Sequence, residues 1–191
     1  MRIGLYFGSF NPIHHGHLII ASHIANHGPV DQVWLVVSPQ NPLKPAPGLL
    51  NEFHRLHLAR LAIAADDMQL KVSDVEFGLP KPSYTIDTLT YLSEKYPQHQ
   101  FAVIMGSDSF ENIHKWKNHT LLMQQYPLLV YLRPDHSLPN HLPKGITVLK
   151  APMLDISATY IRKLIQEKKS IRYLVPEPVR IEIEKAGYYV K

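Results

Sequence analysis

The sequence RIGLYFGSFNPIHHGH, residues 2–17, joins an apolar run to a glycine and then to closely spaced histidines. Apolar side chains on both faces of residues 2–7 predict a short buried strand that ends at Gly8. The apolar spacing that follows predicts a helix over residues 15–27, and a second buried strand is predicted over residues 31–38. A strand, a helix and a strand in this order form a βαβ unit, which implies a parallel sheet.

The same alternation continues along the rest of the chain. Further strands are predicted near residues 70–75, 101–105, 128–132 and 147–149, and helices near residues 51–65, 83–96, 107–116, 119–125, 157–168 and 176–186. This order predicts an α/β fold, a doubly wound parallel sheet with C-terminal helices, in a single domain over residues 1–191. In such sheets ligands bind at the carboxyl ends of the strands, where the strand order reverses.

Composition restricts the classes of function. The 191 residues are 45% hydrophobic and 19% charged, as in an ordinary globular enzyme. The net charge of +4 without basic runs favours small anionic substrates over nucleic acid, and the absence of cysteine excludes thiol chemistry. With no signal peptide and no apolar segment of about 18 residues, we expect a cytoplasmic protein that does not bind membranes. The oligomeric state stays open, a homo-oligomer included.

His14 and His17 are three residues apart where the first helix begins, so we expect both imidazoles on one face of its first turn. That turn also offers unpaired backbone N–H groups and the positive end of the helix dipole. Together they predict a phosphate clamp, in which bound phosphate would favour protonated imidazole. A metal site is the alternative, but no neighbouring carboxylate or HExxH pattern supports it, and we expect no metal held by protein ligands.

A second anion site is predicted near the C-terminus, where Ser157 is placed to cap a helix. Thr159 lies in the first turn of that helix, and Arg162 comes round beside it. A hydroxyl, backbone N–H groups and a guanidinium then converge on one anion. The alternative is a capped helix with a solvated arginine.

Two further polar features follow predicted strands. Gly106 and Asp108 come after the strand at residues 101–105 and place a carboxylate at the same sheet edge, although an aspartate at a helix start is often only a cap. Trp116 is flanked by two lysines, so we expect it to be partly exposed and not a core residue. Arg133, after the strand at residues 128–132, is another basic candidate.

Three strings of the chain resemble known motifs. The string HHGH at residues 14–17, preceded by GSFNP at residues 8–12, resembles the (T/H)xGH signature of the nucleotidylyltransferase superfamily. DISATYIR at residues 155–162 resembles its ISSTxIR segment, with Ala158 where the family often has serine. PSYTIDTL at residues 82–89 resembles the SYTxxTL motif of the adenylyltransferases that act on nicotinate mononucleotide.

The resemblance extends to the GxD loop with its spaced tryptophan, and to NPLK at residues 41–44, which is similar to a lysine-bearing substrate loop. It implies a Rossmann-like nucleotidylyltransferase fold and transfer of the adenylyl group of ATP to nicotinate mononucleotide, with Mg²⁺ accompanying ATP. It implies ATP binding by Gly8, Ser9, Phe10, His14, His17, Gly106, Asp108, Ser157, Thr159 and Arg162. It implies mononucleotide binding by Asn11, Lys44, Ser83, Tyr84, Thr85 and Trp116, and catalytic roles for His14, His17 and Arg162.

The start of the helix near residues 83–85 bears on substrate choice. Ser83 or Thr85 can cap it, and its N–H groups suit the carboxylate of a nicotinate ring better than a neutral carboxamide. Rival substrates are nicotinamide mononucleotide and pantetheine phosphate, and Trp116 weighs against the second. A nucleotide-binding regulatory module without catalysis, suggested only by Ala158, is the rival from another class.

Overall fold

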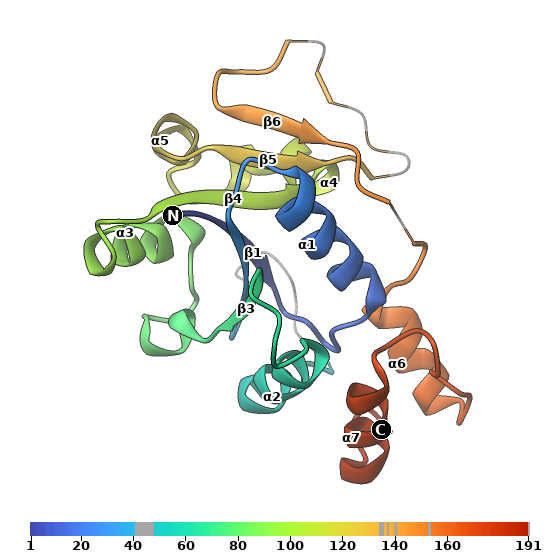
Figure 1. The fold of residues 1–191 in the computed structure, drawn as a ribbon. Coiled ribbons are helices and arrows are strands. Elements are labelled where there is room, and N and C mark those ends of the chain that lie inside the picture. Colours follow the sequence, from blue (N-terminus) through green and yellow to red (C-terminus); the bar gives the residue numbers. More distant parts are fainter. Residues whose placement is uncertain (41–47, 134–135, 137, 140, 153, 191) are drawn as a thin grey trace.

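The computed structural model describes residues 1–40, 48–133, 136, 138–139, 141–152 and 154–190. Its centre is a six-stranded parallel sheet with the order β3-β2-β1-β4-β5-β6, drawn in Figure 1. The strands are β1 (Arg2–Gly8), β2 (Gln32–Val37), β3 (Leu70–Ser73), β4 (Gln100–Gly106), β5 (Leu128–Tyr131) and β6 (Ile146–Leu149). The order reverses between β1 and β4, so the expected doubly wound sheet is confirmed, and its switch point lies after these two strands.

Helices cover both faces of this sheet. They are α1 (His15–His27), α2 (Glu52–Ala62), α3 (Thr85–Lys95), α4 (Ser107–Glu111), α5 (His119–Gln125), α6 (Ala158–Gln166) and α7 (Glu177–Ala186), with the 3-10 turns η1 (Val75–Gly78) and η2 (Ile113–Lys115). Figure 1 shows α1, α2, α6 and α7 on one side and α3 and α5 on the other, and each group contributes to its own apolar core. Among the described residues, no helix is long and apolar enough to cross a membrane.

Two predicted elements differ from the structure near the site. The strand expected to reach residue 75 ends at Ser73, because the pairing of β2 with β3 ends there and the Ser73 hydroxyl accepts a hydrogen bond from the N–H of Val75. The chain then forms η1. The helix expected over residues 107–116 is divided into α4 and η2 at Asn112, whose N–H is shared between the carbonyls of Phe110 and Ser109.

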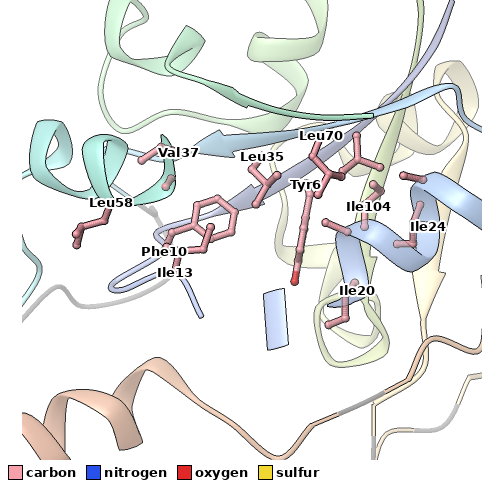
Figure 2. Packing of buried hydrophobic residues seen from close by; sticks show 14 of the residues in the cluster. Tyr6, Phe10, Ile13, Ile20, Ile24, Leu35, Val37, Leu58, Leu70 and Ile104 are labelled. Carbon is pink, nitrogen blue, oxygen red and sulfur yellow. The ribbon is translucent and has the colours of Figure 1, made fainter. Parts of the chain in front are cut away.

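The turn after β1 is anchored in the core by its own side chains. Phe10 is 2% exposed and Ile13 is fully buried. Figure 2 shows both side chains near Tyr6 of β1, with Ile20 and Ile24 of α1 in the same cluster. Because burying one such side chain contributes about 1.5–3 kcal/mol, this packing holds the turn in one conformation.

Candidate active site

The glycine that ends β1 is required by close packing. A Cβ on Gly8 would lie 2.8 Å from the Cζ atom of Phe10, and Phe10 itself has a left-handed φ of 45°. Gly8 does not have a positive φ, so contact with the Phe10 ring, and not a left-handed backbone, accounts for this glycine. That ring packs edge-on against Tyr6 and His17, which leaves only the Phe10 backbone for a ligand.

The two histidines of the HHGH string lie on one face, as predicted. Their rings are stacked with centroids 3.7 Å apart. The backbone N–H of His14 donates to Nδ1 of His17 at 3.3 Å, so a neutral His17 carries its proton on Nε2. His14 is 5% exposed, and its Nδ1 has no hydrogen-bond partner among the described residues. A buried polar atom of this kind calls for a partner such as a ligand or water.

Burial decides the charge of this pair. Burial, with smaller contributions from the positive charges of Arg133 and His15, lowers the pKa of His14 to about 4. Burial likewise lowers the pKa of His17 well below its usual value, with smaller contributions from His14 and Arg133. Both rings are therefore neutral at pH 7, and the charge expected from them requires a bound phosphate, which raises both pKa values.

The start of α1 is less open than the sequence predicts. The N–H of His15 donates to the carbonyl of Leu174 at 3.0 Å, and that of His14 is taken by His17. The expectation of unpaired N–H groups is thus wrong for these two. The physical reason is the segment before α7, where Ile171 and Val175 are each 2% exposed and hold the chain against the start of α1.

The start of α6 joins the histidine turn through Arg162. Its Nη1 donates to the carbonyl of Asn11 at 2.8 Å, and its Nη2 donates to the Thr159 hydroxyl at 3.2 Å. Ser157 caps α6 by accepting from the N–H of Tyr160, as predicted. A hydroxyl, a guanidinium and a helix start are thus brought next to the His14 turn from a distant part of the chain.

A cavity of about 530 Å³ lies at the carboxyl ends of β1 and β4. The predicted site residues that line it are Gly8, Ser83, Tyr84, Thr85, Gly106, Asp108 and Trp116. The predicted residues His14, His17, Ser157, Thr159 and Arg162 form the neighbouring cluster and do not line this cavity. The expected residues therefore form two adjacent groups, and Lys44 lies outside the described residues.

Asp108 and Arg133 form an ion pair at the cavity edge, with 2.9 Å between Oδ2 and Nη1. Asp108 lies within α4, and no side chain caps that helix, so this aspartate is not merely a cap. A Cβ on Gly106 would collide with the Asp108 carboxylate and lie 3.0 Å from Cδ of Arg133. Gly106 is therefore needed for this pair to form above the end of β4.

Trp116 is half-buried, as expected, and its surroundings connect it to α3. The ammonium group of Lys117 lies 2.7 Å from Asp87 and 4.9 Å from the centre of the Tyr84 ring. These contacts join the tryptophan loop to the first turn of α3 across the cavity. A flat ring beside a helix start suits an aromatic ligand that carries an anionic group.

The start of α3 differs from its prediction. Neither Ser83 nor Thr85 caps it, because the helix begins at Thr85 with Tyr84 as N-cap, and no described side chain accepts from its first turn. The Ser83 hydroxyl instead donates to Oε2 of Glu76 at 2.8 Å. Glu76 is 2% exposed. Burial raises the pKa of its carboxyl, although hydrogen bonds from the hydroxyls of Ser83 and Thr88 act to lower it.

Asn11 was expected at the substrate, but its side chain has protein partners. It is 6% exposed, its Nδ2 donates to the carbonyl of Gly48 at 3.0 Å, and its Oδ1 accepts from the N–H of Leu50. This amide holds the segment before α2 against the turn after β1. Any direct contact of Asn11 with substrate is therefore left to its backbone.

Arg55 is a structural residue of the site that the sequence reading missed. It is fully buried and donates at 2.6–2.9 Å to the carbonyls of Ser9, Ser38, Pro39 and Leu50, which joins the loops after β1 and β2. The sequence does indicate its burial, since Arg55 precedes Leu58 and Ala59 by three and four residues and so lies on the apolar face of α2. For Glu76, also missed, no local pattern marks the residue.

The part of the chain that the structure describes holds no group of three or more side chains suited to a metal ion. A divalent cation at this site would depend on ligands other than such a cluster. Mg²⁺ commonly binds through substrate phosphates and water with few protein ligands.

Comparison with known proteins agrees with this geometry. The family model for cytidylyltransferase-like proteins matches residues 5–164. A probable nicotinate-nucleotide adenylyltransferase of Cytophaga hutchinsonii is 52% identical over 192 residues, which cover 99% of this chain and 98% of that protein. The chain belongs to the nicotinate-nucleotide adenylyltransferase family. A second relative in this family, from Flavobacterium psychrophilum, is 47% identical over the full length of both chains.

Solved structures support the fold of this family member. The nicotinic acid mononucleotide adenylyltransferase of Plasmodium falciparum complexed with NaAD superposes with a TM-score of 0.83 at 20% identity, covering 98% of this chain and 97% of that one. The same protein complexed with APC gives a TM-score of 0.81 at 20% identity, with 98% and 96% covered. The predicted Rossmann-like nucleotidylyltransferase fold is confirmed, and the chain is a nucleotidyltransferase.

Proposed function

We propose that this enzyme transfers the adenylyl group of ATP to nicotinate mononucleotide, forming deamido-NAD and pyrophosphate in NAD biosynthesis. The observation that carries the proposal is the bond from Arg162 to the carbonyl of Asn11. This bond holds the start of α6 beside the histidine turn. His17 of that turn packs against Tyr6 in the cavity wall, and Trp116 and the start of α3 line the same cavity. The names of the relatives agree with this reaction.

The chemistry is an in-line displacement at phosphorus. An oxygen of the mononucleotide 5′-phosphate attacks the α-phosphorus of ATP, the bond to the β-phosphate oxygen breaks, and pyrophosphate leaves. The attacking phosphate is already ionised at neutral pH, so no general base and no covalent enzyme intermediate are needed. Such a transfer depends on positioning and on stabilisation of charge.

Within the histidine cluster, the roles follow from hydrogen bonding. His17, whose Nδ1 is occupied by the backbone of His14, has only Nε2–H to donate to a phosphate oxygen. His14 has an unpartnered Nδ1, and phosphate binding would protonate it. Arg162 supplies a permanent charge to the leaving pyrophosphate. Ser157 and Thr159 contribute the helix start that receives the same phosphates.

The cavity residues would bind the mononucleotide and the adenosine. Trp116 would stack on the pyridine ring, and the N–H groups of Tyr84 and Thr85 would meet the ring carboxylate. Gly106 and Asp108 would contact the adenosine part, and Lys44 a substrate phosphate. Mg²⁺ would arrive with ATP, held by phosphates and water.

The test measures pyrophosphate release from ATP and Mg²⁺ with nicotinate mononucleotide, nicotinamide mononucleotide or phosphopantetheine as acceptor. We expect rapid release with the nicotinate substrate. Release with phosphopantetheine alone would refute the substrate, and none with any acceptor would favour a binding module without catalysis.

A variant tests the histidine role separately. His17→Ala should lower kcat roughly 100-fold or more while the melting temperature stays near that of the wild type. His27→Ala, at the exposed end of the same helix, is the matched control and should keep full turnover.

A further inference from the structure

Glu76 is a buried residue in the wall of the cavity, and its carboxylate has no role in the reaction proposed for this enzyme. Its Oε2 accepts from the Ser83 hydroxyl at 2.8 Å and its Oε1 from the Thr88 hydroxyl at 2.9 Å. The Ser38 side chain, just after β2, also lowers the pKa of the Glu76 carboxyl. Within the described residues no basic side chain acts on Glu76, so its charge depends on these hydroxyl donors.

The two bonds to Ser83 and Thr88 determine how α3 begins. Thr88 lies in the first turn of α3, and its hydroxyl also donates to the Tyr84 carbonyl at 3.2 Å. Ser83 immediately precedes the N-cap residue, Tyr84. Glu76 therefore fixes the chain on both sides of the helix start.

The hydroxyl of Ser83 does not cap α3, because Ser83 lies one residue before the N-cap and Glu76 holds its side chain there. A serine that caps a helix accepts a hydrogen bond from an N–H of the first turn. Ser83 donates its proton to Glu76, and among the described residues no side chain accepts from the first turn of α3. In that part of the chain the N–H groups of Tyr84 and Thr85 have no side-chain acceptor, and both residues line the cavity.

We propose that Glu76 is a positioning residue that keeps the start of α3 uncapped for the ring carboxylate of the mononucleotide, and thereby sets the preference for acid over amide. This inference rests on the proposed function. Because the protons of Ser83 and Thr88 are directed to Glu76, these hydroxyls cannot donate to the ligand. The ring carboxylate then meets backbone N–H groups, which favour an anion more than a neutral carboxamide.

The test is Glu76→Gln, assayed at neutral pH with each substrate varied in turn. The amide nitrogen cannot accept a hydroxyl proton, so one of the two hydroxyls loses its acceptor, and the start of α3 is no longer held at both Ser83 and Thr88. We expect KM for nicotinate mononucleotide to rise roughly tenfold. Both kcat and KM for ATP should stay within about twofold, and the preference for the nicotinate over the nicotinamide substrate should fall. Glu94→Gln, at an exposed position of α3, is the matched control.

A second variant keeps the inference testable where Glu76→Gln fails to fold. Thr88→Val preserves shape and removes one of the two bonds to Glu76, and we expect a smaller rise, roughly threefold, in the same KM. An unchanged or lowered KM for nicotinate mononucleotide in the folded variants, or an equal rise in KM for ATP, would overturn the inference. A wild-type enzyme that releases no pyrophosphate with this acceptor would instead refute the proposed function.

Discussion

Two helices of the site begin with the same local pattern, serine, one residue, then threonine, and yet they start differently. In α6 the Ser157 hydroxyl accepts from the N–H of Tyr160, and the helix begins at the next residue. In α3 the Ser83 hydroxyl donates to Glu76, and the helix begins at Thr85, two residues after the serine. The comparison shows that the pattern marks a helix start, while the partner of the serine decides whether the start is capped.

The two helix starts also differ in charge. The first turns of α6 bring Arg162 beside Thr159, whereas α3 carries Asp87 in its first turn and receives Lys117 from another segment. A site with its own guanidinium suits a polyphosphate, which needs bidentate donors and charge. A site of backbone N–H groups suits a single carboxylate. Under the proposed function, the start of α6 would therefore bind the phosphates of ATP, and the start of α3 would bind the carboxylate of the pyridine ring.

The largest expected effect comes from removing the guanidinium of α6. Arg162→Ala should lower kcat/KM for ATP roughly 100- to 1000-fold, because both its contacts and its charge on the phosphates are lost. Steady-state pyrophosphate release with varied ATP measures this. Lys163→Ala, exposed on the same helix, is the control. A loss of less than about threefold in kcat/KM for ATP would show that the charge of Arg162 does not act on the phosphates of ATP.

Replacing each serine by aspartate tests directly whether Ser157 accepts a hydrogen bond and Ser83 donates one. Ser157→Asp keeps an oxygen acceptor at the N-cap, so the free energy of unfolding should change by less than about 1 kcal/mol. Ser83→Asp places a second carboxylate against Glu76 and should cost about 3 kcal/mol or more. Urea denaturation of both variants provides the measurement. Equal costs would show that the two serines have the same role.

Removing the α6 cap has an intermediate effect. Ser157→Ala should lower the free energy of unfolding by about 1 kcal/mol, since the N–H of Tyr160 loses its acceptor. Thermal and urea unfolding report this value. Ser157→Asn should restore most of it, and failure of the restoration would argue against capping as the cause.

The start of α3 contacts a buried carboxyl, that of Glu76, and this carboxyl makes the stability of the protein depend on pH. Burial raises the pKa of its carboxyl in the folded protein, so the folded state binds more protons than the unfolded state. The contribution of Glu76 to stability is therefore full below its ordinary pKa of 4.5 and is lost as pH rises through the raised value. Unfolding of Glu76→Gln across this range should lack that decline. Parallel curves for the variant and the wild type would contradict it.

The smallest effect is expected at Ala158, where this chain departs from the superfamily motif. Ala158→Ser should change KM for ATP by less than about twofold and the free energy of unfolding by less than about 0.5 kcal/mol. The cap by Ser157 and the bonds of Arg162 do not involve the side chain of residue 158. A large gain in affinity for ATP would show that the missing hydroxyl matters.

Much of this protein follows from short-range rules that the sequence expresses directly. Buried strands, helices with apolar spacing and the βαβ unit after Arg2 depend on periodicities of a few residues, and the structure confirms them. The stacking of His14 on His17 and the cap by Ser157 are also local, and both are present as predicted. For these features the deciding neighbours lie within one helical turn.

Other features depend on partners that only the tertiary structure brings together. The carbonyl of Leu174 accepts a hydrogen bond from the N–H of His15, and Glu76 accepts one from the hydroxyl of Ser83. Arg162 donates to the carbonyl of Asn11, which is 151 residues away in the sequence. A hydroxyl, an N–H or a guanidinium accepts many partners, and local sequence does not choose among them. Packing of distant segments makes that choice, because a buried polar group must find a hydrogen-bond partner wherever the fold supplies one.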